Sequence, residues 1–252
     1  MTELTEKFLH ETTSRLERLT ALAADGGLDE AITLLADSIN AGGVVQAFGT
    51  GHSQAFAMEI AGRAGGLIPT NATALRDVVL FGDRDPSVLS DGILERDASI
   101  GEELWATIVT DPADVFVIAS NSGVNGSIVG LALLAKQHGH QVIAVTSLDH
   151  TSKVEPKDPS GKRLSEVADV VIDNLAPYGD TTLALDDNTT GVGAVSSMTA
   201  AFIAQLLTIG VAERLAAGGD TPPVYISANI PAGDEHNRQL EERYAGRLRR
   251  HA

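Results

Sequence analysis

Two hydroxyl-rich loops contain the residue types best suited to binding an anion. The first, Gly49-Thr50-Gly51-His52-Ser53, supplies two hydroxyl groups and a flexible glycine backbone directly before a predicted helix. Backbone N–H groups at the start of a helix bind phosphate without any cationic side chain. The same Gly-x-Gly pattern also occurs in tight turns that hold no ligand, and it lacks the third glycine of a dinucleotide-binding fingerprint.

The second loop repeats this chemistry. Ser120-Asn121-Ser122-Gly123, followed by Ser127, again offers hydroxyl and amide groups between an apolar run and a helix-like segment. Loops at the carboxyl ends of parallel strands form a crevice, which is where open α/β sheets bind ligands. The sequence therefore predicts an anion site between the two loops, although Ser and Asn in such places also serve as helix N-caps.

Short apolar runs and amphipathic stretches alternate along the chain. The runs predict buried strands, and the longer periodic stretches predict helices. The predicted strands are residues 44–48, 115–119, 141–146 and 170–173. The predicted helices are residues 4–22, 28–40, 54–64, 100–110, 128–138, 192–215 and 234–250. This alternation is typical of an α/β fold, in which helices cover both faces of a parallel sheet.

Two segments need separate interpretation. Residues 71–112 contain turn-forming residues and no clear strand, so we interpret them as an insertion or lid. The predicted helix over residues 192–215 is almost wholly apolar, so we expect it in the core or in a subunit interface. No low-complexity tract or proline-rich linker divides the chain, which predicts one domain over residues 1–252.

The composition excludes several classes of partner and chemistry. The formal net charge of −16 opposes a large basic surface, so we expect neither a nucleic acid nor a membrane as partner. The chain has no cysteine, which excludes disulfides and thiolate chemistry and suits a reducing compartment. The first 20 residues mix charged and apolar side chains, unlike a signal peptide, so we expect a cytoplasmic protein.

The two strand–loop–helix units together resemble the sugar isomerase (SIS) domain over residues 28–215. Further motifs at residues 159–164, 176–180 and 230–237 resemble an uncharacterised SIS subfamily of similar length, grouped with phosphosugar isomerases. The resemblance implies a three-layer α/β/α sandwich with a five-stranded parallel sheet, to which this chain adds the helices predicted at its two ends. It also implies a phosphorylated sugar as ligand and assembly as a homodimer or dimer of dimers.

The resemblance also carries site residues over to this chain. The implied phosphate-binding positions are Ser53, Ser120, Ser122, Asn125 and Ser127, where the last often holds Asp in the family. The predicted site also includes the loop residues Gly51 and Asn121. In the family, a Ser/Thr-rich stretch often approaches the phosphate. The residues that match this stretch here, in the long apolar helix, are Ser196, Ser197 and Thr199.

The resemblance implies the ligand class more directly than the reaction, and the first activity that we consider is the interconversion of an aldose and a ketose phosphate. It needs a base that moves a proton between C2 and C1, commonly Glu, and a group that opens the sugar ring, commonly His. Glu235 and His236, which start the terminal helix, are the favoured acid/base pair, from the same subunit or its neighbour. The other candidates are Glu59, which can instead form a surface ion pair with Arg63, and His52 in the first loop.

Other activities remain open at this stage. Some phosphoheptose isomerases bind zinc through a His and a Glu on the helix that here holds Glu59 and Arg63, so we predict no metal and no cofactor. The same fold and proton abstraction also support an etherase or lyase acting on an amino-sugar phosphate. A non-catalytic sugar-phosphate sensor is a third possibility, although residues 1–40 offer no basic helix-turn-helix.

Overall fold

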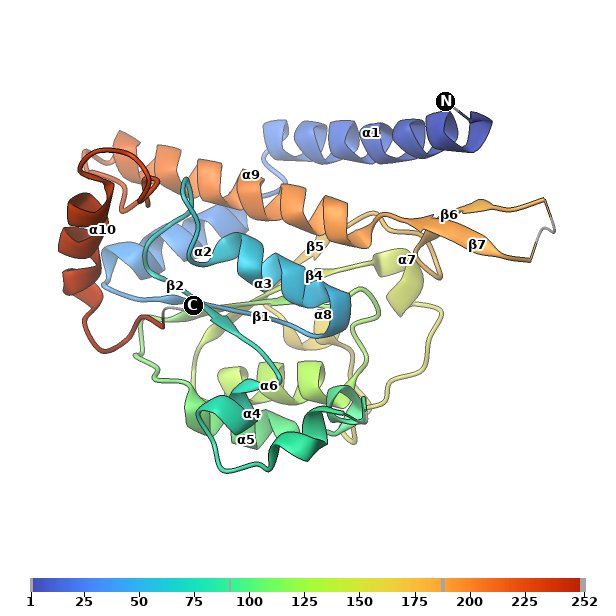
Figure 1. The fold of residues 1–252 in the computed structure, drawn as a ribbon, viewed down its shortest axis with the longest axis horizontal. Coiled ribbons are helices and arrows are strands. Elements are labelled where there is room, and N and C mark those ends of the chain that lie inside the picture. Colours follow the sequence, from blue (N-terminus) through green and yellow to red (C-terminus); the bar gives the residue numbers. More distant parts are fainter. Residues whose placement is uncertain (1, 91, 187–188, 250–252) are drawn as a thin grey trace.

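A five-stranded parallel sheet lies at the centre of the computed structural model, which describes residues 2–90, 92–186 and 189–249 (Figure 1). The strands lie in the order β2-β1-β3-β4-β5. Their bounds are β1 (Val45–Gly49), β2 (Thr70–Thr73), β3 (Val115–Ala119), β4 (Gln141–Thr146) and β5 (Val170–Asp173). Gly49 pairs with Ala119, so β1 and β3 end side by side. The predicted fold class is confirmed.

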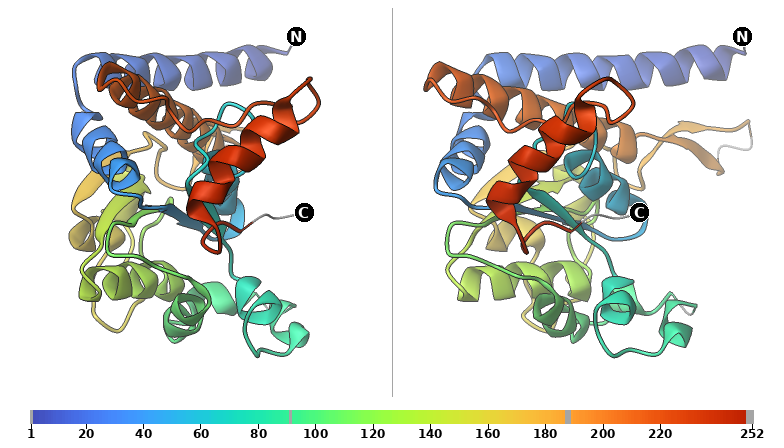
Figure 2. Two further views of the ribbon diagram at one scale, coloured as in Figure 1. Left: turned by 90° about the vertical axis from the view of Figure 1, so that its left-hand side faces the viewer. Right: turned by 60° about the vertical axis from the view of Figure 1, so that its left-hand side comes forward.

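Helices cover both faces of the sheet, as Figure 2 shows. One layer contains α1 (Glu3–Ala24), α2 (Asp29–Asn40), α3 (Gln54–Ile60) and α9 (Ser196–Ala217). The other contains α4 (Asp77–Leu80), α5 (Ile100–Thr107), α6 (Gly126–Gln137) and α8 (Leu164–Val167). Alternate residues of β3 serve the two cores: Val117 packs in the first, whereas Phe116 and Ile118 pack in the second. This double burial explains the continuous apolar runs in the sequence.

The interpretation of residues 71–112 as an insertion or lid was wrong at its start. Residues 70–73 form β2, an edge strand that pairs with β1 along its whole length. Its sequence, Thr-Asn-Ala-Thr, lacks the apolar run that marks the other strands. These polar side chains can be buried because hydrogen bonds satisfy them. Asn71, for example, donates to Gln46 Oε1 at 3.3 Å and to the Arg247 carbonyl at 2.8 Å.

The remainder of that segment packs beneath the sheet. It forms α4, the short helices η2 (Pro86–Leu89) and η3 (Leu94–Arg96), and α5. Val78, Ile100 and Leu104 from these elements are buried in the second core. Most of the segment is therefore an integral part of one helical layer.

A small hairpin precedes α9. Its strands, β6 (Thr181–Ala184) and β7 (Gly191–Ala194), pair antiparallel and project away from the sheet beside α1 (Figure 1). The predicted start of the long helix at residue 192 was therefore wrong, since α9 begins at Ser196. A β-carbon at Gly193, whose φ is +74°, would lie 2.8 Å from the Phe8 ring of α1. The glycine thus permits close contact between the hairpin and α1.

The apolar helix α9 is a central part of the first layer. Among the residues that the structure describes, it alone is long and apolar enough to cross a membrane, judged by length and composition. In this fold it packs against α1, α2 and α3. Ile203, Leu207 and Val211 are fully buried there, so its hydrophobicity has an explanation within the fold.

The C-terminal segment is held by buried charges. The terminal helix is shorter than predicted: α10 spans Gly233–Glu241 and is followed by η4 (Glu242–Tyr244). Beyond it, Arg247 forms an ion pair with Asp114 and Arg249 forms one with Asp77, at 3.4 Å. Both carboxylate side chains are fully buried. The other short helices are η1 (Gly51–Ser53), between β1 and α3, and α7 (Leu148–Thr151), after β4.

We expect Arg247→Ala to lower the free energy of unfolding by about 3 kcal/mol, because it leaves the buried Asp114 carboxylate without its cation. Urea denaturation measures the effect. Arg238→Ala is the control, since Arg238 pairs with Glu235 and Glu242 on the exposed face of α10. Equal shifts in the two variants would contradict a special role for the buried pair.

Candidate functional site

A small pocket lies at the carboxyl ends of β1 and β3, where the two hydroxyl-rich loops meet. Its walls come from the first loop, the second loop, the end of β5 and the start of α9. The polar residues that line it are His52, Ser53, Ser120, Asn121, Asn174, Ser196 and Ser197. The predicted crevice therefore exists, and it brings together six of the predicted site residues: His52, Ser53, Ser120, Asn121, Ser196 and Ser197.

The first loop turns sharply between β1 and α3. Gly51 has φ of +54°, in the left-handed region, and begins the single turn η1. A β-carbon at Gly49 would lie 2.3 Å from the Ser53 carbonyl oxygen, so the strand must end in glycine for the loop to close. This tight turn places Ser53 in the pocket wall and leaves the His52 side chain 58% exposed.

The second loop is fixed by its own hydrogen bonds. Ser120 Oγ accepts from the Gly123 N–H at 3.1 Å, and Gly123 has φ of +65°. Asn174 Nδ2 donates to Asn121 Oδ1 at 3.1 Å. Ser120 and Asn121 therefore line the pocket in fixed positions, whereas Ser122 lies in the same turn but outside the lining.

Asn125 and Ser127 contact η3. Asn125 Nδ2 donates to Glu95 Oε1 at 2.6 Å, and Ser127 Oγ donates to the Glu95 carbonyl at 2.7 Å. Lys157 Nζ donates to Asn125 Oδ1 at 3.3 Å. In this structure both residues anchor η3 to the start of α6, and their contact with phosphate stays a prediction.

Glu95 is a carboxylate that no sequence pattern singled out, because it falls in the segment interpreted as a lid. Its Oε2 atom would lie 3.5 Å from a β-carbon at Gly51, while its Oε1 atom accepts from Asn125. Glu95 therefore lies between the first loop and the start of α6. It is a half-buried acidic group beside the first loop, hydrogen-bonded to the residue that precedes α6, and it is not among the residues that line the pocket.

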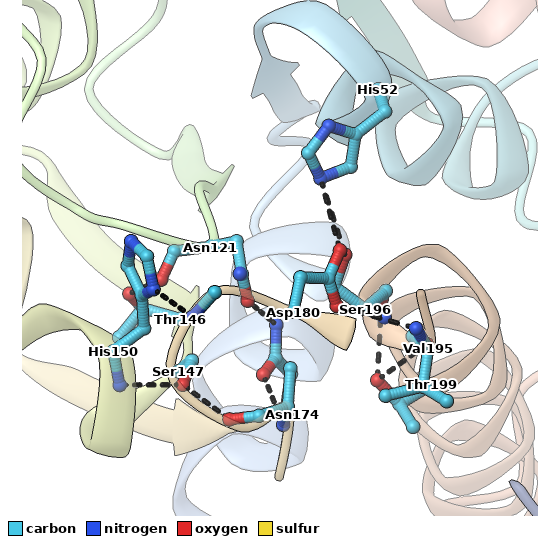
Figure 3. Close-up of polar contacts among 12 residues, drawn as sticks. His52, Asn121, Thr146, Ser147, His150, Asn174, Asp180, Val195, Ser196 and Thr199 are labelled. Atoms are coloured by element: carbon cyan, nitrogen blue, oxygen red, sulfur yellow. Dashed lines mark hydrogen bonds and ion pairs between the residues drawn. The ribbon is translucent and has the colours of Figure 1, made fainter. Parts of the chain in front are cut away.

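Asp180 is the second acidic group to which the sequence assigned no role, although it ends the motif at residues 176–180. Its Oδ1 atom accepts from the N–H groups of Val195, at 3.2 Å, and Ser196, at 2.9 Å. Its Oδ2 atom accepts from Ser196 Oγ at 2.6 Å and lies 3.9 Å from His52 Nε2 (Figure 3). Asp180 caps α9 across the β6–β7 hairpin, so no local N-cap motif marks it. Thr199 is buried one turn later and hydrogen-bonds within α9.

His150, on α7, helps to hold the segment that carries Asp180. Its Nδ1 atom accepts from the Gly179 N–H at 2.9 Å, and its ring stacks on Tyr178. Burial lowers the pKa of His150, and the carboxylates of Asp180 and Asp149 oppose that shift. The neutral imidazole is the form that can accept this backbone hydrogen bond.

Three of the predicted catalytic residues lie outside the pocket lining. Glu59 accepts hydrogen bonds from Arg63 and, at 2.6 Å, from Gln205 of α9. Glu235 is exposed and pairs with Arg238, which lowers the pKa of its carboxyl group. His236 Nε2 lies 3.1 Å from the Val224 carbonyl oxygen.

Glu235 and His236 are also far from the pocket of their own chain. Leu240 of α10 packs against Val44 and Ile68, which precede β1 and β2. This contact places α10 at the amino ends of the strands, whereas the pocket lies at their carboxyl ends. Figure 1 shows α10 and the β6–β7 hairpin at opposite ends of the molecule.

The family follows from sequence comparison. A family model described as the SIS domain matches residues 7–147. A UPF0309 protein of Listeria monocytogenes is 38% identical over 94% of each chain, and one of Brucella canis is 35% identical over 98% of each. The chain belongs to the SIS-domain family, within the UPF0309 group. The predicted resemblance to an uncharacterised SIS subfamily is confirmed.

Solved structures share the SIS fold at low sequence identity. A phosphoheptose isomerase from Francisella tularensis superposes with a TM-score of 0.54 at 17% identity, covering 84% of this chain and 100% of that one. An Escherichia coli CFT073 protein in complex with a phosphosugar gives a TM-score of 0.50 at 17% identity, over 85% of this chain and 93% of the other. These likenesses establish the fold of this SIS-domain protein.

The lowered pKa of His150 predicts a pH dependence of stability. The folded-state pKa lies below the ordinary value of 6.5, so the unfolded chain binds the proton more readily. This contribution therefore destabilises the fold as the pH falls through 6.5 and is absent well above it. In His150→Asn, whose amide oxygen can still accept from Gly179, the urea midpoint is expected to fall less on acidification than in the wild type. An identical fall in both proteins would contradict this assignment.

Proposed function

We propose that this protein binds a phosphorylated sugar in the pocket and interconverts its aldose and ketose forms by proton transfer. One observation carries the proposal: hydroxyl groups from three separate elements, Ser53, Ser120 and Ser197, line the same pocket. Membership of the SIS family supports it, as do fold relatives that include a phosphoheptose isomerase and a protein in complex with a phosphosugar.

The pocket suits a phosphate although no Lys or Arg among the described residues lines it. Hydroxyl and backbone N–H groups donate hydrogen bonds to phosphate oxygens, and such bonds to a charged acceptor are strong. At the start of α9 the Val195 and Ser196 N–H groups already donate to Asp180, so this helix contributes the Ser197 hydroxyl group to the pocket. A local arrangement of donors therefore offsets the overall negative charge of the chain.

Proton transfer needs an acid/base group beside the bound sugar. His52 lines the pocket and is the candidate for opening the sugar ring. Glu95 is our candidate for the base that moves a proton between C2 and C1, because this half-buried carboxylate lies beside the first loop and is held there by Asn125. Glu59 remains an alternative base on α3.

Glu235 and His236 can serve this site only from a neighbouring subunit, given their position at the amino ends of the strands. Their participation therefore belongs to the proposal that the protein is a homodimer or a dimer of dimers. In that arrangement α10 of one copy would lie against the pocket of another.

Ser53→Ala and Ser197→Ala are each expected to weaken binding of a sugar phosphate by about 10- to 100-fold, which is the loss of one hydrogen bond to a charged group. Titration calorimetry with the aldose or ketose phosphate that most raises the melting temperature measures this. Ser87→Ala, on η2 and outside the pocket lining, is the matched control. Unchanged affinity in both pocket variants would overturn the phosphate site.

Glu95→Gln is expected to slow proton exchange at C1 or C2 by at least about 100-fold, because the amide cannot act as a base. Deuterium incorporation from D2O, followed by NMR, measures the rate, with Glu59→Gln in parallel. Loss of exchange in Glu59→Gln alone would assign the base to Glu59 and contradict our choice.

The product separates the possible activities of the wild-type protein. Exchange with formation of the other sugar isomer supports an isomerase. Elimination would identify an etherase or lyase on an amino-sugar phosphate, and binding without exchange would identify a sensor; either result would overturn the proposed reaction. No binding by any sugar phosphate would overturn the ligand class.

A further inference from the structure

Asp180, Ser196 and His52 form a hydrogen-bonded chain at the pocket. Ser196 Oγ lies 2.6 Å from Asp180 Oδ2 and 3.2 Å from His52 Nε2, so the hydroxyl group bridges the carboxylate and the imidazole (Figure 3). Ser196 is buried and the Asp180 side chain is only 15% exposed. The hydrogen bond between Ser196 and Asp180 is therefore shielded from water.

Counting protons fixes the direction of these hydrogen bonds. A serine hydroxyl has one proton, and an ionised carboxylate can only accept. Ser196 must therefore donate its proton to Asp180, so its oxygen accepts in the contact with His52. A neutral His52 consequently carries its proton on Nε2, and its Nδ1 atom has a free lone pair.

We propose that Asp180 and Ser196 are positioning residues that hold neutral His52 as the Nε2–H tautomer, so that Nδ1 accepts a proton from a hydroxyl group of the bound sugar. When Nδ1 takes this proton, the resulting imidazolium lies 3.9 Å from the Asp180 carboxylate and is stabilised by it. The role of Nδ1 rests on the proposed function, whereas the tautomer is a property of the free protein.

The chain around Asp180 is built to hold this carboxylate in place. Asp180 adopts φ of +66°, a left-handed conformation that Asp tolerates better than most residues. The preceding segment is tied to α7, because Asp149 Oδ2 accepts from the Tyr178 N–H at 2.7 Å and His150 accepts from Gly179. Two backbone N–H groups at the start of α9 then hold Asp180 Oδ1. Asp180 is also the one ion-pair partner of His52 among the described residues.

Asp180→Asn provides a sharp test, since it is expected to reverse the tautomer. Its amide oxygen replaces Oδ1 as acceptor for the two backbone N–H groups, so its NH2 group faces Ser196 Oγ. Ser196 then donates to His52 Nε2, and the imidazole proton moves to Nδ1. Asn also keeps the left-handed backbone conformation available, which favours correct folding.

The tautomer is measured by NMR of 15N-labelled, ligand-free protein at a pH where His52 is neutral, with the His52 signals assigned from a His52→Asn variant. We expect the Nε2–H form in the wild type, the Nδ1–H form in Asp180→Asn, and a mixture in Ser196→Ala. Asp149→Asn is the control, because it removes a carboxylate that holds the same segment. Among the described residues, Asp149 is not an ion-pair partner of His52. This variant should leave the wild-type tautomer unchanged.

A wild-type Nδ1–H form, or an unchanged tautomer in both Asp180→Asn and Ser196→Ala, would overturn the inference. Sugar-phosphate turnover tests the functional part, and we expect Asp180→Asn to lower it by about 100-fold or more with a smaller change in KM. Unchanged turnover with a reversed tautomer would overturn the role of Nδ1. The tautomer is measured on ligand-free protein. Failure to find any sugar phosphate that binds would therefore contradict only the proposed function.

Discussion

The register between β1 and β3 is the constraint on which the site depends. Because Gly49 pairs with Ala119 in a parallel ladder, the two strands end next to each other, and the loops that follow them lie side by side. A parallel connection requires a long crossover, so residues far apart in the chain meet at one edge. The double burial of β3 stabilises this arrangement through both apolar cores. The pocket is thus a consequence of how the sheet is assembled.

A charged group, Asp180, lies at the start of α9 beside the pocket. Asp180 satisfies two N–H groups that a helix otherwise leaves without partners, and it places a negative charge beside His52. A single carboxylate therefore links the start of a long core helix to His52 in the first loop. The β6–β7 hairpin, which separates Asp180 from α9 in sequence, is what allows this contact.

The acidic residues near the pocket differ from the loop residues in how well local sequence patterns predict them. The loop glycines and serines were recognisable because turn chemistry and helix starts have local signatures, and the family resemblance supported them. Glu95 has no such signature, and Asp180 ends the motif at residues 176–180 without any local sign of its role. Their place at the crevice depends on contacts with residues distant along the chain, such as Asn125 and Ser196. The favoured pair, Glu235 and His236, was chosen on residue type and family resemblance, and the fold puts it at the other end of the sheet.

Sequence patterns were enough to predict the α/β class, four of the five strands, the two hydroxyl-rich loops and the SIS family. Those features depend on periodicity, glycine geometry and short motifs, which act over neighbouring residues. The three-dimensional structure was needed to show that the polar segment Thr70–Thr73 is the edge strand β2 and that Asp180 caps α9 beside His52. Such features depend on hydrogen bonds that bury polar groups between distant segments, and local sequence patterns do not encode those contacts.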